Sequence, residues 1–288
     1  MTATGTLYLV ATPIGNLEDI TIRALNVLRQ VDLIVAEDSR HSARLLQRYE
    51  ISTPCTRSYY QGVERQRTAP LLAQLQAGKQ IALICDAGTP LISDPGYPLV
   101  RSAVEAGIPV RPIPGPTALI AGLIASGLPS NAFIFDGVPP KKDKRRQEYF
   151  RSLLGERRTV VLYESPHRIL QTLRAIAEIL PERPLVLCRE LTKVHEELLR
   201  GRAREIREKL AVRPAIKGEF VLIIRGAEQP EASSEREELS ITAQVQRLVE
   251  AGWDRRDALK EVARLCGLPK REVYDAVVAA KLIPKGKA

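Results

Sequence analysis

The stretch Ile81-Ala-Leu-Ile-Cys-Asp-Ala-Gly-Thr-Pro90 decides the fold, because an apolar run passes directly into a turn of small and polar residues. The pattern recurs where Leu7 to Ala11 precedes Thr12-Pro-Ile-Gly-Asn16 and where Val110 to Ile113 precedes Pro114-Gly-Pro-Thr-Ala118. Such apolar runs are typical of parallel strands covered by helices on both faces. Ligands of open α/β sheets bind beyond the carboxyl ends of strands, where glycine lets backbone N–H groups approach. Together the turns predict a small-molecule pocket, although each alone also fits a tight turn or helix cap.

Helical segments alternate with these runs in the first half of the chain. The apolar spacing predicts helices over residues 21–28 and 71–76 and a strand over residues 33–36. Residues 117–126 are almost wholly apolar and suit a buried helix, which Gly127 ends. This alternation indicates βαβ units with crossover helices.

The second half repeats the α/β pattern after a stretch that is rich in proline and lysine. The predicted elements are strands over 159–163, 185–188 and 219–224 and helices over 167–180 and 203–210. An acidic stretch without apolar periodicity then indicates a flexible linker. We expect an N-terminal α/β domain over 1–128, a second α/β domain over 129–226, a linker over 227–239 and a C-terminal helical domain over 240–288.

The C-terminal region shows helical spacing over residues 241–250, 257–266 and 271–280. Its last two segments fit a helix-turn-helix, with Ala263 at the crossing, Gly267 at the turn and Val273 as apolar anchor. Lys270 and Arg271 would then begin the second helix, where groove contacts occur. A plain three-helix bundle used for packing or dimerisation fits the same pattern, and the sequence leaves both interpretations open.

The composition is that of a globular protein with a basic surface. The 288 residues are 44% hydrophobic, and 43 Lys and Arg against 34 Asp and Glu give a net charge of +9. This excess attracts phosphate backbones, but it also fits a protein kept soluble by self-repulsion. A polyanionic partner such as nucleic acid is therefore one of two interpretations.

Cysteine and histidine spacing argues against a metal site. The four cysteines and three histidines are scattered without clustered ligands, so we expect reduced thiols and no metal.

No basic leader precedes an apolar core, and no apolar run approaches the roughly 20 residues that cross a bilayer. We expect a cytoplasmic protein that does not enter a membrane.

Three charged clusters follow predicted strands: Glu37-Asp-Ser-Arg-His41, Tyr163-Glu-Ser-Pro-His-Arg168 and Arg189-Glu-Leu-Thr-Lys193. Each alone fits a helix N-cap with solvated ion pairs. Their repetition at strand ends in both halves favours a site. The glycine-rich signatures of P-loop hydrolases and of dinucleotide-binding folds are absent from the sequence.

These turns and clusters together resemble the tetrapyrrole methylase superfamily, the class III S-adenosylmethionine-dependent methyltransferases, and within it the members that methylate ribosomal RNA. The motifs that carry the resemblance are Leu9-Val-Ala-Thr-Pro-Ile-Gly-Asn-Leu17, Ala36-Glu-Asp-Ser-Arg-His41, Asp86-Ala-Gly-Thr-Pro-Leu-Ile-Ser-Asp-Pro-Gly96, Pro114-Gly-Pro-Thr-Ala118, Tyr163-Glu-Ser-Pro-His-Arg168, Arg189-Glu-Leu-Thr-Lys193 and Gly218-Glu-Phe-Val-Leu-Ile223. They extend over most of the chain and are far more specific together than any one turn.

The resemblance implies a fold, a reaction and a cofactor site. It implies two α/β domains around a cofactor cleft, with a small C-terminal helical domain, and homodimers. The implied reaction is methyl transfer from S-adenosylmethionine to the 2′-oxygen of a cytidine in the decoding region of 16S ribosomal RNA, with the small ribosomal subunit as partner. The residues that would line the cofactor are Pro13, Asp86, Gly88, Thr89, Pro90, Thr117, Ala118 and Tyr163.

Roles for the charged residues follow from the chemistry of this reaction. A ribose hydroxyl is a poor nucleophile, so a nearby carboxylate or imidazole is expected to take its proton. Glu37, Asp38 and Glu164 are the candidates for base or orienting group, followed by His41. The predicted RNA contacts are Arg40, His41, Lys141, Lys142, Lys144, Arg145, Arg146, Arg168 and Lys193. The run from Lys141 to Arg146 also fits a solvated linker.

Two other functions remain open at this stage. A methylase of a small tetrapyrrole precursor, or a diphthine-type enzyme, would share the family's motifs. A non-catalytic regulator would bind nucleic acid through the C-terminal helices and a ligand through the front domains. The net charge, the cluster around Arg40 and His41, and the basic C-terminal region favour the RNA enzyme over the first of these.

Overall fold

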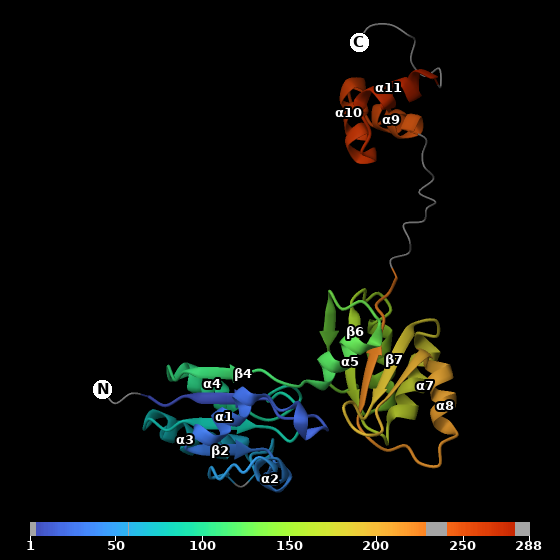
Figure 1. The fold of residues 1–288 in the computed structure, drawn as a ribbon. Coiled ribbons are helices and arrows are strands. Elements are labelled where there is room, and N and C mark those ends of the chain that lie inside the picture. The colour runs from blue at the N-terminus through green and yellow to red at the C-terminus, as the bar shows by residue number, and fades with distance from the viewer. Residues whose placement is uncertain (1–3, 57, 229–240, 280–288) are drawn as a thin grey trace. The chain divides into compact units, whose positions relative to one another are not determined.

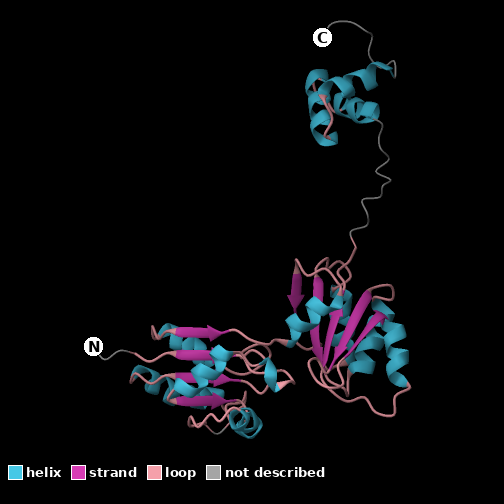
Figure 2. Ribbon diagram, viewed as in Figure 1, coloured by secondary structure: helices cyan, strands magenta, loops and turns pink. Residues whose placement is uncertain are grey.

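The computed structural model describes residues 4–56, 58–228 and 241–279. The chain divides into two compact units, Met1–Ala227 and Glu228–Ala288 (Figure 1). The first unit contains two β-sheets covered by helices, and the described part of the second contains helices only (Figure 2).

The first sheet has four strands in the order β2-β3-β1-β4, and all its pairs are parallel. The strands are β1 (Leu7–Val10), β2 (Leu33–Ala36), β3 (Ile81–Ile84) and β4 (Val110–Ile113). They confirm the predicted apolar runs within one residue. Because parallel strands end at the same edge, the turns that follow β1, β3 and β4 meet there.

Helices cover both faces of this sheet, as its apolar strands require. The helices α1 (Ile22–Gln30) and α2 (Ser39–Arg48) pack on one face, and α3 (Glu64–Gln76) and α4 (Tyr97–Glu105) on the other. The sequence predicted α1 and the end of α3, but it missed α2 and α4. The start of α2 is fixed by Asp38, whose Oδ1 accepts the Arg40 N–H at 2.9 Å.

The second sheet has five strands in the order β5-β6-β9-β7-β8. The strands are β5 (Phe133–Phe135), β6 (Thr159–Glu164), β7 (Pro184–Arg189), β8 (Glu197–Arg202) and β9 (Phe220–Ile224). The pair β5·β6 is parallel and the other pairs are antiparallel. The sequence missed β5 and β8, which lie at the two edges and are too short or too polar to show an apolar run.

Helices again cover both faces of this sheet. On one face lie α6 (Asp143–Ser152), α7 (Ile169–Ile179) and α8 (Ala203–Ala211). On the other lies α5 (Ala118–Ser126), which ends at Gly127 with φ of 77°, as predicted. A Cβ on Gly122 of α5 would lie 3.3 Å from both Val221 and Ile223, so glycine lets this helix approach β9 closely.

The packing of α5 shows where the chain passes from the first sheet to the second. The predicted boundary between residues 1–128 and 129–226 assigns α5 to the first half, whereas the structure packs it on the second sheet. The chain thus passes from one sheet to the other at residues 114–117, just after β4. The apolar sequence of α5 predicts that the helix is buried, but it does not indicate which sheet the helix packs against.

The basic run was expected in an exposed connection, and the structure corrects this. Its residues enter α6, which begins at Asp143 and buries Phe150 in the core. Prolines before residue 141 suggested a loop, but none lies within the helix itself.

The C-terminal unit contains α9 (Ile241–Glu250), α10 (Arg255–Cys266) and α11 (Lys270–Ala279). These helices confirm the predicted segments within two residues. Gly267 ends α10 with φ of 65°, and Ala263 and Val273 are buried in the unit's core. Residues 229–239 of the predicted linker, and residues 280–288, lie outside the described part of the chain. Among the described residues, no helix is long and apolar enough to span a bilayer.

Candidate functional site

The turns after β1 and β3 are joined by their backbones. The Thr12 N–H donates to the Gly88 carbonyl at 2.8 Å, and the Gly88 N–H donates to the Thr12 carbonyl at 3.0 Å. The Thr12 hydroxyl also donates to the Cys85 carbonyl at 3.1 Å. Gly88 has φ of 88°, a conformation that residues with side chains rarely adopt. This pairing holds the two turns in one fixed arrangement.

The third turn connects this arrangement to the second sheet. The Thr89 hydroxyl contacts the Thr117 hydroxyl and donates to the Pro116 carbonyl at 3.2 Å. The Leu119 N–H, at the start of α5, donates to the Tyr163 hydroxyl of β6 at 3.2 Å. Elements from both sheets therefore position the residues around Thr117.

A cavity of about 470 Å³, the α5 cavity, lies among these turns. Its volume and largely apolar walls are typical of small-molecule sites. It is lined by Ile14, Glu37, Asp86, Ala87, Gly88, Thr89, Ile92, Ser93, Asp94, Thr117, Ala118, Val138, Tyr163, Glu164, Ser165, Pro166, Gly218, Glu219, Phe220 and Val221. The structure thus gathers Asp86, Gly88, Thr89, Thr117, Ala118 and Tyr163 of the predicted cofactor residues around one cavity.

A second cavity of about 390 Å³, the α2 cavity, adjoins the first. It is lined by Thr12, Pro13, Ile14, Gly15, Leu17, His41, Ser42, Arg44, Leu45, Cys85, Asp86, Ala87, Lys193 and Glu219. It shares Ile14, Asp86, Ala87 and Glu219 with the α5 cavity. Pro13, predicted to line the cofactor, lines this second cavity instead. Pro90 belongs to the same turn as Gly88 but lines neither of the two.

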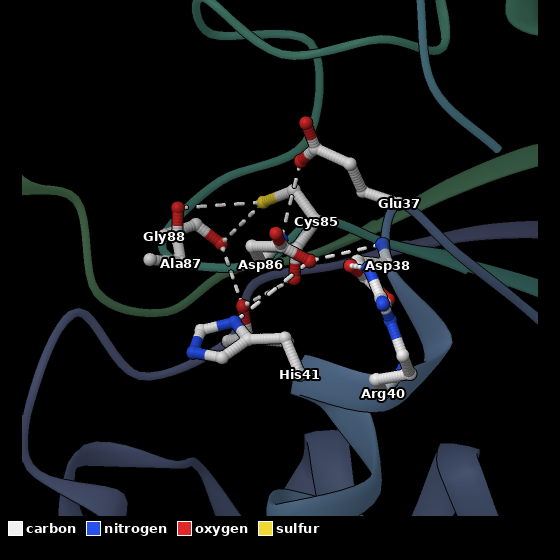
Figure 3. Close-up of polar contacts among 9 residues, drawn as sticks. Glu37, Asp38, Arg40, His41, Cys85, Asp86, Ala87 and Gly88 are labelled. Carbon is white, nitrogen blue, oxygen red and sulfur yellow. Dashed lines mark hydrogen bonds and ion pairs between the residues drawn. The ribbon is translucent and has the colours of Figure 1, made fainter. Parts of the chain in front are cut away.

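Two carboxyl groups in the α5 cavity have raised pKa values. Burial, together with the charge of Asp94, raises the pKa of Glu37 to about 7. Burial raises the pKa of Asp94 to about 6. The Asp86 N–H donates to Glu37 Oε2 at 3.3 Å, as Figure 3 shows. Asp94 was not predicted as a site residue, although it lies in the same motif as Asp86.

The other two predicted bases are engaged elsewhere. Hydrogen bonds from Arg40 lower the pKa of Asp38 to about 2, so its carboxylate is a weak proton acceptor. The Glu164 carboxylate is fully buried, and it accepts the Ser165 N–H at 2.8 Å and the Thr172 hydroxyl at 2.6 Å. The base role predicted for these two residues stays a prediction, and their contacts favour Glu37 among the three carboxyl groups.

Some of the predicted RNA-binding residues are exposed to solvent, and others are bonded to groups of the protein itself. The Arg146 side chain is 3% exposed and bonded to Asp143, and Arg168 donates to the Pro139 carbonyl while pairing with Glu164. Both guanidinium groups are engaged within the protein, and their predicted RNA contact stays a prediction. Lys193 lines the α2 cavity and pairs with two glutamates. Arg40, His41, Lys141, Lys142, Lys144 and Arg145 are exposed at the surface.

Metal ligation was not expected from the sequence. Within the described residues, no group of three or more His, Cys, Asp or Glu side chains is placed to hold a metal ion.

Two adjoining cavities at the carboxyl ends of parallel strands are typical of an enzyme that binds a small molecule, and comparison with known proteins gives the family. The family model of the Tetrapyrrole (Corrin/Porphyrin) Methylases matches residues 6–207. The chain belongs to this family, a class of S-adenosylmethionine-dependent methyltransferases.

The most informative relatives carry a single name. The chain is 48% identical to the ribosomal RNA small subunit methyltransferase I of Synechocystis sp., over 94% of this chain and 96% of that protein. It is 41% identical to the protein of the same name from Bacillus subtilis, over 94% of each chain.

A solved structure shows the same fold at low sequence identity. The chain resembles uroporphyrin-III C-methyl transferase from Thermus thermophilus, crystallised with S-adenyl homocysteine, with a TM-score of 0.52 and 20% identity. The match covers 77% of this chain and 97% of that one.

Proposed function

We propose that this protein transfers the methyl group of S-adenosylmethionine to the 2′-oxygen of a cytidine in the decoding region of 16S ribosomal RNA. The observation that carries the proposal is the pair of adjoining cavities, because a methyl transfer needs a donor and an acceptor side by side. The near full-length identity to ribosomal RNA methyltransferases supports RNA as the acceptor.

The residues of the α5 cavity fit the methyl donor. Its apolar walls, including Ile92 and Val221, suit an adenine ring, and the backbone at Gly88 is open to close approach. The donor carries two positively charged groups, a sulfonium and an ammonium. Glu37 and Asp94 line the cavity, and their ionised carboxylates are negatively charged. Shape and charge therefore both match this compound.

The chain's contribution to the reaction is positioning and desolvation. When bound, S-adenosylmethionine supplies an electrophilic methyl group, which the acceptor oxygen must approach in line. The backbone pairing of Thr12 with Gly88 fixes the wall between the cavities, and Tyr163 closes the site from the second sheet. Walls such as Ile14, which lines both cavities, exclude water.

The setting of the reaction is part of the same proposal. We infer that the enzyme acts in the cytoplasm, as a homodimer, on the small ribosomal subunit during ribosome biogenesis. The linker role of residues 227–239 belongs to it too, as do the RNA contacts of Arg40, Lys193 and the exposed cations at the start of α6. Names of the relatives and the net charge of +9 support an RNA substrate.

Methyl incorporation tests the proposal directly. Purified protein is incubated with labelled S-adenosylmethionine and small ribosomal subunits that lack the modification, and nucleosides of the RNA are analysed by mass spectrometry. We expect 2′-O-methylcytidine from wild type. Gly88→Val should abolish both incorporation and cofactor binding, because it places a branched side chain at a φ of 88° in the cavity wall.

Gly107→Val is the matched control for this experiment. Gly107 also has positive φ, 68°, but a Cβ there would meet nothing within 4 Å and the residue lines neither cavity. It should bind cofactor and methylate RNA as wild type does. Methylation of a tetrapyrrole precursor instead of RNA, or RNA binding without methyl transfer, would replace the proposal with one of its two alternatives.

A further inference from the structure

An imidazole and a carboxylate face each other in the wall of the α2 cavity. His41 Nδ1 lies 3.8 Å from Asp86 Oδ1, and both side chains line that cavity (Figure 3). The His41 side chain is 54% exposed, so a substrate can reach it. Asp86 also lines the α5 cavity, which places the pair at the junction of the two.

Both partners are fixed by the first turn of α2 and the turn after β3. Asp86 Oδ1 accepts the Asp38 N–H at 3.0 Å, and Asp38 caps the helix on which His41 lies. The Asp86 backbone N–H donates a hydrogen bond to Glu37 Oε2. The carboxylate therefore has a defined position, and the imidazole lies within ion-pair distance of it.

The other acid–base groups are less suited to receive a proton on this side. Asp38 is bonded to Arg40, and the Glu164 carboxylate is buried. Glu37 lines the α5 cavity but not the α2 cavity. Lys193, which does line the α2 cavity, already donates to Glu190 and Glu219. Glu219, another exposed carboxylate of this cavity, is paired with Lys193. Among the described residues that line the α2 cavity, His41 therefore supplies the imidazole, and its side chain is half-exposed.

We propose that the ribose of the target nucleotide occupies the α2 cavity, that His41 accepts the proton of its 2′-hydroxyl, and that Asp86 positions the imidazole. This inference rests on the proposed function and names the groups that carry it out. Asp86 holds the proton on Nδ1, which leaves the lone pair of Nε2 free, as in other carboxylate–imidazole pairs. Asp86 acts through His41 and is a positioning residue.

The transfer balances in atoms and charge. The hydroxyl O–H bond breaks and its proton passes to Nε2 of His41, which becomes an imidazolium. The oxygen electron pair forms the new bond to the methyl carbon as the bond from that carbon to sulfur breaks. The electrons of the broken bond stay on sulfur, which becomes a neutral thioether, and the imidazolium then releases its proton to water.

The charges around this imidazole suit a nucleotide. Arg44 lies one turn beyond His41 on α2, and Lys193 and Glu219 face the cavity from the second sheet. The charged groups near His41 also include Asp86 on the loop after β3, and Asp38 and Arg40 at the start of α2. A guanidinium beside a ribose site is placed to bind a flanking phosphate.

Replacement of His41 by alanine tests the role, with His195→Ala as the matched control. His195 is exposed on the loop between β7 and β8 and lines neither cavity. We expect His41→Ala to lower the turnover number by about 100-fold or more. Its affinities for S-adenosylhomocysteine, measured by calorimetry, and for the RNA substrate, measured by fluorescence anisotropy, should stay at the wild-type values.

Chemical rescue separates a proton acceptor from a structural residue. Added imidazole should restore turnover of His41→Ala in proportion to its free-base concentration, and should leave His195→Ala unchanged. At saturating donor, Asp86→Asn should lower turnover in wild type but add little to His41→Ala, because the two residues act as a unit.

Two outcomes would overturn the inference. One is a loss of RNA affinity in His41→Ala that accounts for the whole loss of activity, which would make His41 an RNA contact only. The other is wild-type turnover in His41→Ala. Neither is confused with failure of the proposed function, which would appear as wild-type protein that does not methylate RNA.

Discussion

At the scale of single residues, Glu37 and Asp94 show how one cavity changes two carboxyl groups. Both line the α5 cavity, where burial and neighbouring negative charge raise their pKa values and favour the protonated forms. A cationic ligand in that cavity would favour the ionised forms instead. Asp38 follows Glu37 directly in the chain, but it lies beside Arg40 in solvent and has a pKa lowered to about 2.

The raised pKa of Glu37 gives a pH-dependent stability. Its pKa is about 7 in the folded chain against 4.5 ordinarily, so its stabilising contribution is complete below pH 4.5 and is lost as pH rises through 7. Glu37→Gln removes this titration. Measured by urea unfolding without ligand, the variant should gain about 1 kcal/mol relative to wild type between pH 5 and pH 8.5, since the carboxyl is only half-buried.

Asp32→Asn is a control for this measurement, because Asp32 carries an exposed carboxylate on the same half of the chain. It bonds to the Gln80 N–H rather than to the cavity. Equal pH dependence in wild type and Glu37→Gln would show that the Glu37 carboxyl titrates normally in the folded protein.

At the scale of elements, α6 contains both surface and core cations within one run. Lys142, Lys144 and Arg145 are exposed, whereas the Arg146 guanidinium is buried and bonded to Asp143 and the Lys141 carbonyl. Because α6 begins inside the basic run, its helical turn points some of these cations to solvent and others to the core. Their charge in the sequence is the same, but their roles differ.

Neutralising the exposed cations and the buried one should change different properties. Replacing Lys142, Lys144 and Arg145 by glutamine should lower RNA affinity and leave the melting temperature unchanged. The slope of binding against salt should fall by about one unit for each phosphate that the variant no longer neutralises. Arg146→Gln should lower the free energy of unfolding by about 2 kcal/mol, because the buried guanidinium's hydrogen bonds to Asp143 and to the Lys141 carbonyl are lost. Unchanged RNA binding in the triple variant would support a purely solvating role for the run.

Other elements show where local sequence was sufficient. The central strands and α5 were predicted because their apolar runs are continuous, and Gly127 and Gly267 end helices by adopting positive φ. The edge strands β5 and β8 were missed because β5 has three residues, β8 is largely polar, and neither contains a fully buried residue. The helix α2 was missed because its polar residues outnumber the three that face the core.

At the scale of the whole molecule, both cavities belong to the unit Met1–Ala227. The C-terminal unit has exposed cations on two helices, Arg256 and Lys260 on α10 and Lys270 and Arg271 at the start of α11. Removing the C-terminal unit should therefore separate that unit's contribution to RNA binding from cofactor binding.

A chain that ends at Ala227 should retain the wild-type affinity for S-adenosylhomocysteine, because every lining residue of both cavities is present. Its RNA affinity should fall, with a smaller dependence on salt, because the cations of α10 and α11 are removed. Calorimetry and fluorescence anisotropy measure the two affinities. RNA affinity equal to that of the full chain would instead favour the three-helix bundle with a packing role.

The sequence alone determined the apolar strands, the glycine turns that end them and the charged clusters that follow, because each depends on neighbouring residues. Only the tertiary structure decided that α5 packs on the second sheet, that Glu164 and Arg168 pair below the surface, and that His41 faces Asp86. Those contacts depend on how the elements are packed, and the order of strands in the sheets sets which side chains meet. Local periodicity carries no information on that order.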